Sequence, residues 1–225
     1  MLDARLRRII DPPLDRIGAR LAGWRIGADA VTVAGFGVGV GAWIALAVQA
    51  YASALLLVLL NRLCDGLDGA VARHAGVTDR GGYLDIVLDF VFYAGTPFFF
   101  AVGRPEAALP AAFLAFSFMG TASSFLAFAV FAAKRGLAST ARGRKSLYYL
   151  GGLTEGAETI ALFVLVCIAP SWFAPAAWVF GGLCWLTTAS RIAAGAMAFS
   201  GDDRDRADLT QSRAETDGPE QADRR

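Results

Sequence analysis

The chain has 225 residues, of which 56% are hydrophobic, and its mean hydropathy is +0.48. A soluble domain is rarely so apolar, whereas a bundle of membrane helices usually is. The formal net charge of +1 says nothing about partners, and we expect no nucleic acid among them. Cys64, Cys167 and Cys184 each lie in an apolar run and predict small buried side chains rather than disulfides or a zinc site. His74, the single histidine, cannot build a histidine metal site alone.

The first predicted element is an amphipathic helix within residues 1–28. Apolar residues from Leu6 to Trp24 recur at helical spacing, and arginines fall between them. This pattern is typical of a cytoplasmic juxtamembrane helix that lies in the membrane interface, and we expect Pro12 and Pro13 to bend it. A soluble cap helix is the alternative.

Hydropathy predicts a transmembrane catalytic domain over residues 29–200. Its six helices are expected at 30–49, 51–73, 81–103, 107–133, 155–170 and 173–198. The fold class is therefore an all-α integral membrane protein with six transmembrane helices and an interfacial amphipathic helix. Residues 201–225 are polar and mixed in charge, which predicts a disordered cytoplasmic tail.

Small residues and basic residues mark the packing and the orientation of these helices. Two overlapping GxxxG patterns, formed by Gly35, Gly37, Gly39 and Gly41, predict close helix packing in the first span. Basic residues gather in the N-terminal arm and in the loop between the fourth and fifth spans, which predicts that both are cytoplasmic. The loop residues are Lys134, Arg135, Arg142, Arg144 and Lys145, which could also attract anionic lipid.

Four aspartates, Asp65, Asp68, Asp85 and Asp89, interrupt two of the apolar segments. Carboxylates in a bilayer are costly, so they indicate a functional site, and bound cations would relieve their mutual repulsion. The short 74–80 loop predicts an antiparallel helical hairpin, with the acids in two layers about 6–8 Å and about 12 Å from the helix ends. Oxygen ligands favour Mg²⁺ or Mn²⁺, and two layers could hold two ions that clamp a phosphoanhydride.

The residues around the acids fit a phosphate-bearing substrate. Four glycines remove side chains where a nucleotide would approach the backbone, although helix packing explains them equally well. They are Gly66, Gly69, Gly81 and Gly82. Arg73 supplies a planar cation suited to phosphate.

This stretch resembles the CDP-alcohol phosphotransferase motif, D-x2-D-G-x2-A-R-x8-G-x3-D-x3-D. The positions that match in order are Asp65, Asp68, Gly69, Ala72, Arg73, Asp85 and Asp89. One departure is that seven residues, rather than eight, separate Arg73 from Gly81. Aligning Gly82 instead would shorten the spacing to Asp85, and a loop deletion is easier to absorb, so Gly81 is favoured.

The resemblance implies an enzyme of phospholipid biosynthesis that moves a substituted phosphate from a CDP-linked donor to an alcohol and releases CMP. It implies that Asp65, Asp68, Asp85 and Asp89 hold Mg²⁺ or Mn²⁺, and that Asp89 is the general base on the acceptor hydroxyl. It also implies a CDP pocket lined by Gly69, Ala72, Arg73 and Gly81. CDP-diacylglycerol is the expected donor, in a bacterial cell membrane with the site facing the cytoplasm. The acceptor stays open among glycerol phosphate, an inositol phosphate, serine and another lipid-linked alcohol, and a homodimer is compatible with the glycine-rich faces.

Two other functions compete with this one. An intramembrane prenyltransferase would use similar metal–diphosphate patterns, Asn61-x3-Asp65 and Asp85-x3-Asp89, and a cation transporter would also need paired acids. The D-G-x2-A-R run is not part of the prenyltransferase pattern. The spans show no obvious inverted repeat, which argues against a transporter.

Several polar residues outside the motif have open roles. Glu155, Glu158 and Arg191 could recognise the acceptor head group, or could simply snorkel or pair locally. Asp29 and Thr32 are expected to cap the first span. His74 could contact a phosphate, although a solvated loop histidine is the simpler expectation.

Overall fold

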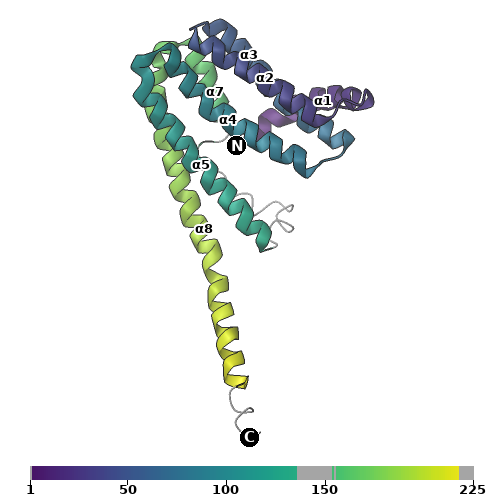
Figure 1. Cartoon of the computed structure of the whole chain (residues 1–225), viewed down its shortest axis with the longest axis vertical. Helices are drawn as coiled ribbons and strands as arrows, with labels where there is room; N and C mark the ends of the chain where they lie inside the picture. The colour runs from purple at the N-terminus through teal and green to yellow at the C-terminus, as the bar shows by residue number, and fades with distance from the viewer. Residues whose placement is uncertain (1, 136–153, 155, 218–225) are drawn as a thin grey trace. The chain divides into compact units, whose positions relative to one another are not determined.

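The computed structural model describes residues 2–135, 154 and 156–217, with side chains described for 10–135, 154 and 156–200. Every regular element in this part of the chain is helical, as the sequence predicts (Figure 1). The seven α-helices are α1 Leu2–Gly23, α2 Ala28–Ala47, α3 Tyr51–Ala75, α4 Asp79–Gly103, α5 Ala108–Lys134, α7 Gly156–Ile168 and α8 Phe173–Asp217. Two 3₁₀ turns, Pro105–Ala107 and Pro170–Trp172, precede α5 and α8.

Three segments are long and apolar enough to cross a membrane by length and composition. They are α2, α4 and the stretch Pro105–Lys134 that includes α5. α7 is apolar but shorter, and α3 carries charged residues in its second half. The described residues thus contain at least three candidate spans, and the count of six remains a prediction.

Tight turns separate α2, α3 and α4. Arg25 and Gln49 adopt positive φ angles of 60° and 58° just before and just after α2. Gly76 has φ 106°, a conformation that favours glycine, and ends α3 with its N–H donating to the carbonyl of Ala72. Thr78 then begins α4 by accepting a hydrogen bond from the Gly81 N–H at 3.0 Å. These turns reverse the chain, as expected for the segment between the two acid-bearing helices.

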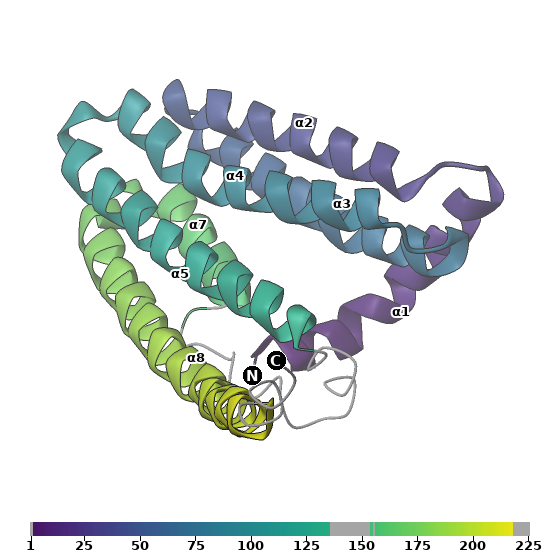
Figure 2. The same cartoon turned by 60° about the horizontal axis from the view of Figure 1, so that its bottom comes forward.

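α2 packs along both α3 and α4 within one compact unit, formed by residues 1–123 and 153–187 (Figure 2). The backbones of α3 and α4 rarely approach within 8 Å of each other, so these two helices meet through long side chains such as Arg62 and Asp89. Phe92 of α4 stacks on Trp43 of α2, and α2 contacts α3 as well.

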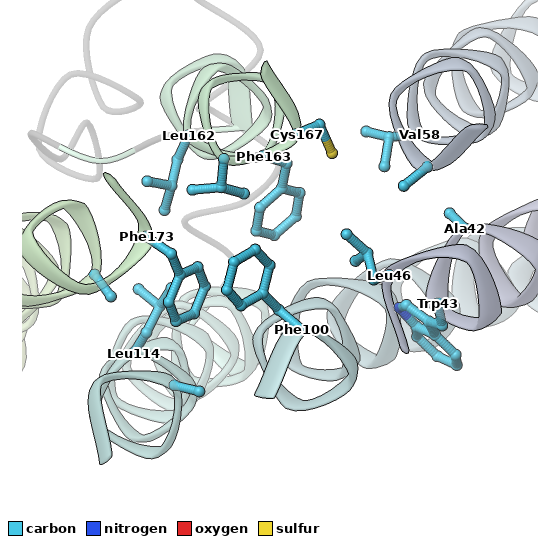
Figure 3. Packing of buried hydrophobic residues seen from close by; sticks show 14 of the residues in the cluster. Ala42, Trp43, Leu46, Val58, Phe100, Leu114, Leu162, Phe163, Cys167 and Phe173 are labelled. Carbon is cyan, nitrogen blue, oxygen red and sulfur yellow. The ribbon is translucent and has the colours of Figure 1, made fainter. Parts of the chain in front are cut away.

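An aromatic and aliphatic core joins α2, α4, α7 and the start of α8 in this unit. Phe100 stacks on Phe173 with ring centroids 3.9 Å apart (Figure 3). Phe163 contacts Phe92 edge to face. Trp43 stacks on Phe92 and donates its indole N–H to Thr96 at 3.3 Å. This core fixes the parts of α2 and α4 that continue into the acid-bearing region.

α1 packs on α3 through its small and apolar residues. A side chain added at Gly18 would lie 2.8 Å from Ala70, and Leu14 is buried against Gly66. Pro12 and Pro13 lie inside α1, and the bend expected there stays a prediction. α2 follows Gly27 without any side-chain cap, so the caps predicted for Asp29 and Thr32 are wrong. Asp29 instead pairs with Arg80 at 3.4 Å.

The second compact unit comprises residues 124–152 and 188–225. Within it, Arg135 donates to the Phe199 carbonyl at 3.0 Å and lies over the Phe199 ring. The helical backbone of α8 reaches Asp217, which differs from the disorder predicted for this segment. Oppositely charged residues four positions apart in its sequence favour a helix, and residues 218–225 lie outside the described residues. The expected domain boundaries themselves stay predictions.

Cys167 and Cys184 are buried, as the sequence predicts, whereas Cys64 is partly buried.

Candidate active site

The four aspartates of the motif line one pocket between α2, α3 and α4. Asp65 and Asp68 come from α3, and Asp85 and Asp89 come from α4. The other residues that line the pocket are Thr32, Gly35 and Phe36 of α2, Asn61 and Arg62 of α3, and Leu88 of α4. Side chains one helical turn apart share a face, and the reversal at 76–78 brings the two acid-bearing faces to the same place.

Thr32 of α2 holds the carboxylate of Asp68 of α3. Asp68 is 5% exposed and accepts a 2.6 Å hydrogen bond from the Thr32 hydroxyl. The same hydroxyl lies 3.1 Å from the Ala28 carbonyl, but it has one proton, and the shorter charge-assisted contact takes it. Thr32 therefore serves the pocket rather than the start of α2.

Arg62 is the cation at the centre of this pocket. Its Nη1 donates to Asp89 Oδ1 at 2.5 Å and lies 3.8 Å from Asp65 Oδ2. Its Nε and Nη2 donate to the Asn61 side-chain oxygen at 2.9 and 2.6 Å. The guanidinium also lies over the rings of Phe92 and Tyr93. It partly neutralises two acids that would otherwise repel each other in an apolar surrounding.

The residues expected to line a CDP pocket lie elsewhere on the same helices. Gly69, Ala72, Arg73 and Gly81 are not part of the acid-lined pocket. Arg73 is half exposed and donates to Asp15 of α1 through Nε and Nη2, at 3.1 and 2.6 Å. A side chain at Gly69 would have Arg73 Nη1 as its nearest neighbour, at 3.7 Å. Arg73 and Gly69 thus form a second surface beside α1.

The motif glycines differ in their surroundings. A side chain at Gly66 would lie 2.8 Å from Leu14, so α1 covers the face that we expected a nucleotide to approach. At Gly81 it would lie 3.0 Å from Asp29 Oδ1, whereas at Gly82 it would meet nothing within 4 Å. Helix packing explains Gly66, and a turn contact explains Gly81. The assignment of Gly81 rather than Gly82 to the motif stays a prediction.

The donor set of the pocket fits a hard divalent ion, although the acids are not arranged as a finished site. Carboxylate oxygens and a hydroxyl are the ligands that Mg²⁺ and Mn²⁺ prefer. Among the residues that the structure describes, no three acidic, histidine or cysteine side chains converge closely enough to hold a metal. The pocket therefore offers suitable ligand atoms at the place where the sequence predicts the metal site. The number of ions stays a prediction.

Sequence reasoning missed the residues that organise the pocket. Arg62 and Tyr93 were not singled out, Asn61 was considered only as part of a prenyltransferase pattern, and Thr32 only as a cap. Arg62 carried a signal, because it is a charge within an otherwise apolar run, three residues before the first acid. Tyr93 carried none, since a tyrosine one turn after Asp89 is ordinary in an apolar helix.

The structure gives no test of the remaining candidate residues as one site. Glu155 and the basic residues 142–145 lie outside the described residues, while Glu158 lies in the first turn of α7. Arg191 lies over the Phe125 ring at 5.8 Å. His74 is exposed near the end of α3. Head-group recognition by Glu155, Glu158 and Arg191 thus stays a prediction.

Comparison with known proteins decides the family. Residues 25–193 match the model of the CDP-alcohol phosphatidyltransferase family. The chain belongs to this family. It is therefore an enzyme of the CDP-alcohol phosphotransferase type, as the motif predicts, and an integral membrane protein.

Individual relatives agree with this assignment. The chain is 52% identical over 196 residues to the inner membrane protein YnjF of Escherichia coli, covering 87% of this chain and 95% of that protein. It is 33% identical over 101 residues to an archaetidylinositol phosphate synthase of Pyrococcus horikoshii, covering 44% of this chain and 54% of that enzyme. The fold is similar to that of a Mycobacterium tuberculosis phosphatidylinositol phosphate synthase with bound CDP-diacylglycerol, with a TM-score of 0.60 and 18% identity. That match covers 81% of this chain and 93% of the other.

Proposed function

We propose that this family member transfers a phosphatidyl group from CDP-diacylglycerol to an alcohol in phospholipid biosynthesis. The observation that carries the proposal is that all four motif aspartates line one pocket. The bound donor in the mycobacterial structure supports the choice of CDP-diacylglycerol. A prenyltransferase and a transporter are disfavoured by the family match.

The roles of the acids follow from the motif. Asp65, Asp68 and Asp85, together with Asp89, would hold Mg²⁺ or Mn²⁺ in the pocket. The chemistry that these ions supply when bound is neutralisation of charge on the phosphoanhydride and on the departing CMP. Thr32 fixes the Asp68 carboxylate for this task, because it donates to one of its oxygens.

Asp89 would act as the general base on the acceptor hydroxyl. The hydroxyl proton passes to the carboxylate while the acceptor oxygen forms a bond to the lipid-linked phosphorus. The bond from that phosphorus to the bridging oxygen breaks, and CMP leaves. Gly69, Ala72, Arg73 and Gly81 would bind the CDP moiety, with the Arg73 guanidinium contacting a phosphate.

The membrane arrangement belongs to the same proposal. Six helices, α2 to α5, α7 and α8, would cross a bacterial cell membrane, with α1 in the cytoplasmic interface. The turn at 76–78 would then face the cytoplasm, where CDP-linked donors are made available to the site. A homodimer is compatible with this arrangement.

Release of CMP by the purified, detergent-solubilised protein tests the reaction. CDP-diacylglycerol and Mg²⁺ are supplied with a panel of alcohols that includes glycerol phosphate, inositol phosphate and serine. We expect CMP release that depends on one acceptor and stops with EDTA. We also expect Asp89→Asn to abolish turnover while the protein remains folded in detergent. Full activity of that variant, or no CMP with any acceptor, would contradict the proposal.

A further inference from the structure

The guanidinium of Arg62 is held by hydrogen bonds to three side chains, which is unusual for a charged residue in an apolar helix. Its side chain is 10% exposed. Asn61 accepts two of its hydrogen bonds, and Asn61 is itself held by donation to the Gly35 carbonyl at 2.8 Å. Nη1 also lies 3.0 Å from the Tyr93 hydroxyl. These anchors come from α2, α3 and α4, so Arg62 cannot move without loss of several contacts.

The contact between Arg62 and Asp89 engages a single carboxylate oxygen. Nη1 donates to Oδ1 at 2.5 Å. A carboxylate held by one oxygen cannot rotate freely, so the direction of its second oxygen, Oδ2, is also set. A general base needs this control, because proton transfer requires hydrogen-bond distance to the acceptor hydroxyl.

The charge of Arg62 has a second consequence for the same acids. It lies within 4 Å of carboxylate oxygens on both Asp65 and Asp89. A divalent cation that binds these acids is repelled by the guanidinium, and like charges at short distance oppose each other strongly where water is scarce.

We propose that Arg62 is a positioning residue of the transferase, which orients Asp89 for the acceptor and weakens divalent-ion binding at the aspartates. This inference rests on the proposed function. Arg62 thereby lowers the affinity of the aspartates for divalent ions while it sets the orientation of Asp89.

Orientation of Asp89 and repulsion of the ion can be separated, because one variant should lower kcat and raise Mn²⁺ affinity. Arg62→Gln removes the charge and the contact to Asp89. We expect kcat to fall about 100-fold, the size of effect that a misplaced reacting group produces. We expect Mn²⁺, measured by the electron paramagnetic resonance signal of the free ion, to bind about tenfold more tightly because repulsion is lost. A merely structural role would weaken both turnover and Mn²⁺ binding.

Two variants that keep the charge complete the test. Arg62→Lys retains the charge but offers one donor nitrogen in place of the three that contact Asn61 and Asp89, and Tyr93→Phe removes one anchor. Both should lower kcat and leave Mn²⁺ affinity close to that of the wild type. Arg104→Gln, which breaks the 2.8 Å ion pair with Glu106 at the other end of α4, is the matched control and should change neither.

The outcomes distinguish this inference from the proposed function. If the wild type binds Mn²⁺ and releases CMP but Arg62→Gln changes neither, the inference is wrong. A parallel fall of both quantities in that variant would also overturn it. If Arg62→Gln cannot be obtained folded, normal kcat in both charge-retaining variants would overturn it. Absence of Mn²⁺ binding and CMP release in the wild type would instead contradict the proposed function.

Discussion

The close approach of α2 to α3 makes Gly35 a sensitive point of the site. A side chain added at Gly35 would place its Cβ 2.6 Å from the Cβ of Cys64. Carbon atoms pack best at about 3.5–4.0 Å, so Gly35→Ala must separate the two helices by about 1 Å. Gly37, two residues further on, is exposed and would meet nothing within 4 Å, which makes Gly37→Ala the matched control.

The expected magnitude follows from two opposing effects. Overpacking costs about 1–3 kcal/mol, whereas replacing a helical glycine with alanine gains up to about 1 kcal/mol. Since both variants share the gain, their free energies of unfolding should differ by about 1–3 kcal/mol. For a chain of this size, that difference corresponds to a separation in Tm of roughly 2–12 °C.

Thermal unfolding of both variants in the same detergent, followed by intrinsic tryptophan fluorescence, measures this difference. CMP release should also fall in Gly35→Ala, because the Gly35 carbonyl anchors Asn61 and so Arg62. Equal Tm values for the two variants would refute the packing argument. A lower Tm with unchanged CMP release would show that the separation of α2 and α3 does not reach Asp89.

Two further predictions concern the residues that hold the acids and Arg73. Thr32→Val removes the 2.6 Å hydrogen bond to buried Asp68 with little change of volume, so Mn²⁺ affinity should fall roughly 10–100-fold; unchanged affinity would place the ion away from Asp68. Asp15→Asn removes the charge that orients Arg73, and steady-state kinetics should show KM for CDP-diacylglycerol rising roughly tenfold with kcat unchanged. Because this pair is half exposed, Tm should move little, and an unchanged KM would separate Arg73 from donor binding.

The helices and their order were predictable because their signals are local. The apolar runs between polar turns predict helices close to α2, α3, α4 and α5, with ends within a few residues. The spacing of the aspartates likewise places Asp65 with Asp68, and Asp85 with Asp89, on common helix faces. α7 begins at Gly156, one residue after the predicted start, and ends at Ile168, two residues before the predicted end. The helical backbone between residue 198 and Asp217 was not predicted, because the low hydrophobicity of that segment indicates disorder, whereas its oppositely charged residues four positions apart favour a helix.

The glycines of the first span show where sequence patterns become ambiguous. Two overlapping GxxxG patterns are present, and both permit close packing. In the structure Gly35 faces Cys64 and Gly39 faces Phe92, whereas Gly37 is exposed. The rotation of α2 about its own axis decides between the two patterns, and that rotation depends on side chains from α3 and α4.

The sequence by itself determined the family, the helical class and the spacing of the four motif aspartates, since these depend on composition and on spacing along one chain. The tertiary structure alone decided how those acids are held. Thr32, Asn61 and Arg62 reach the pocket through contacts between residues 26 to 36 positions apart. No periodicity encodes such contacts, because they depend on how α2 lies across α3 and α4.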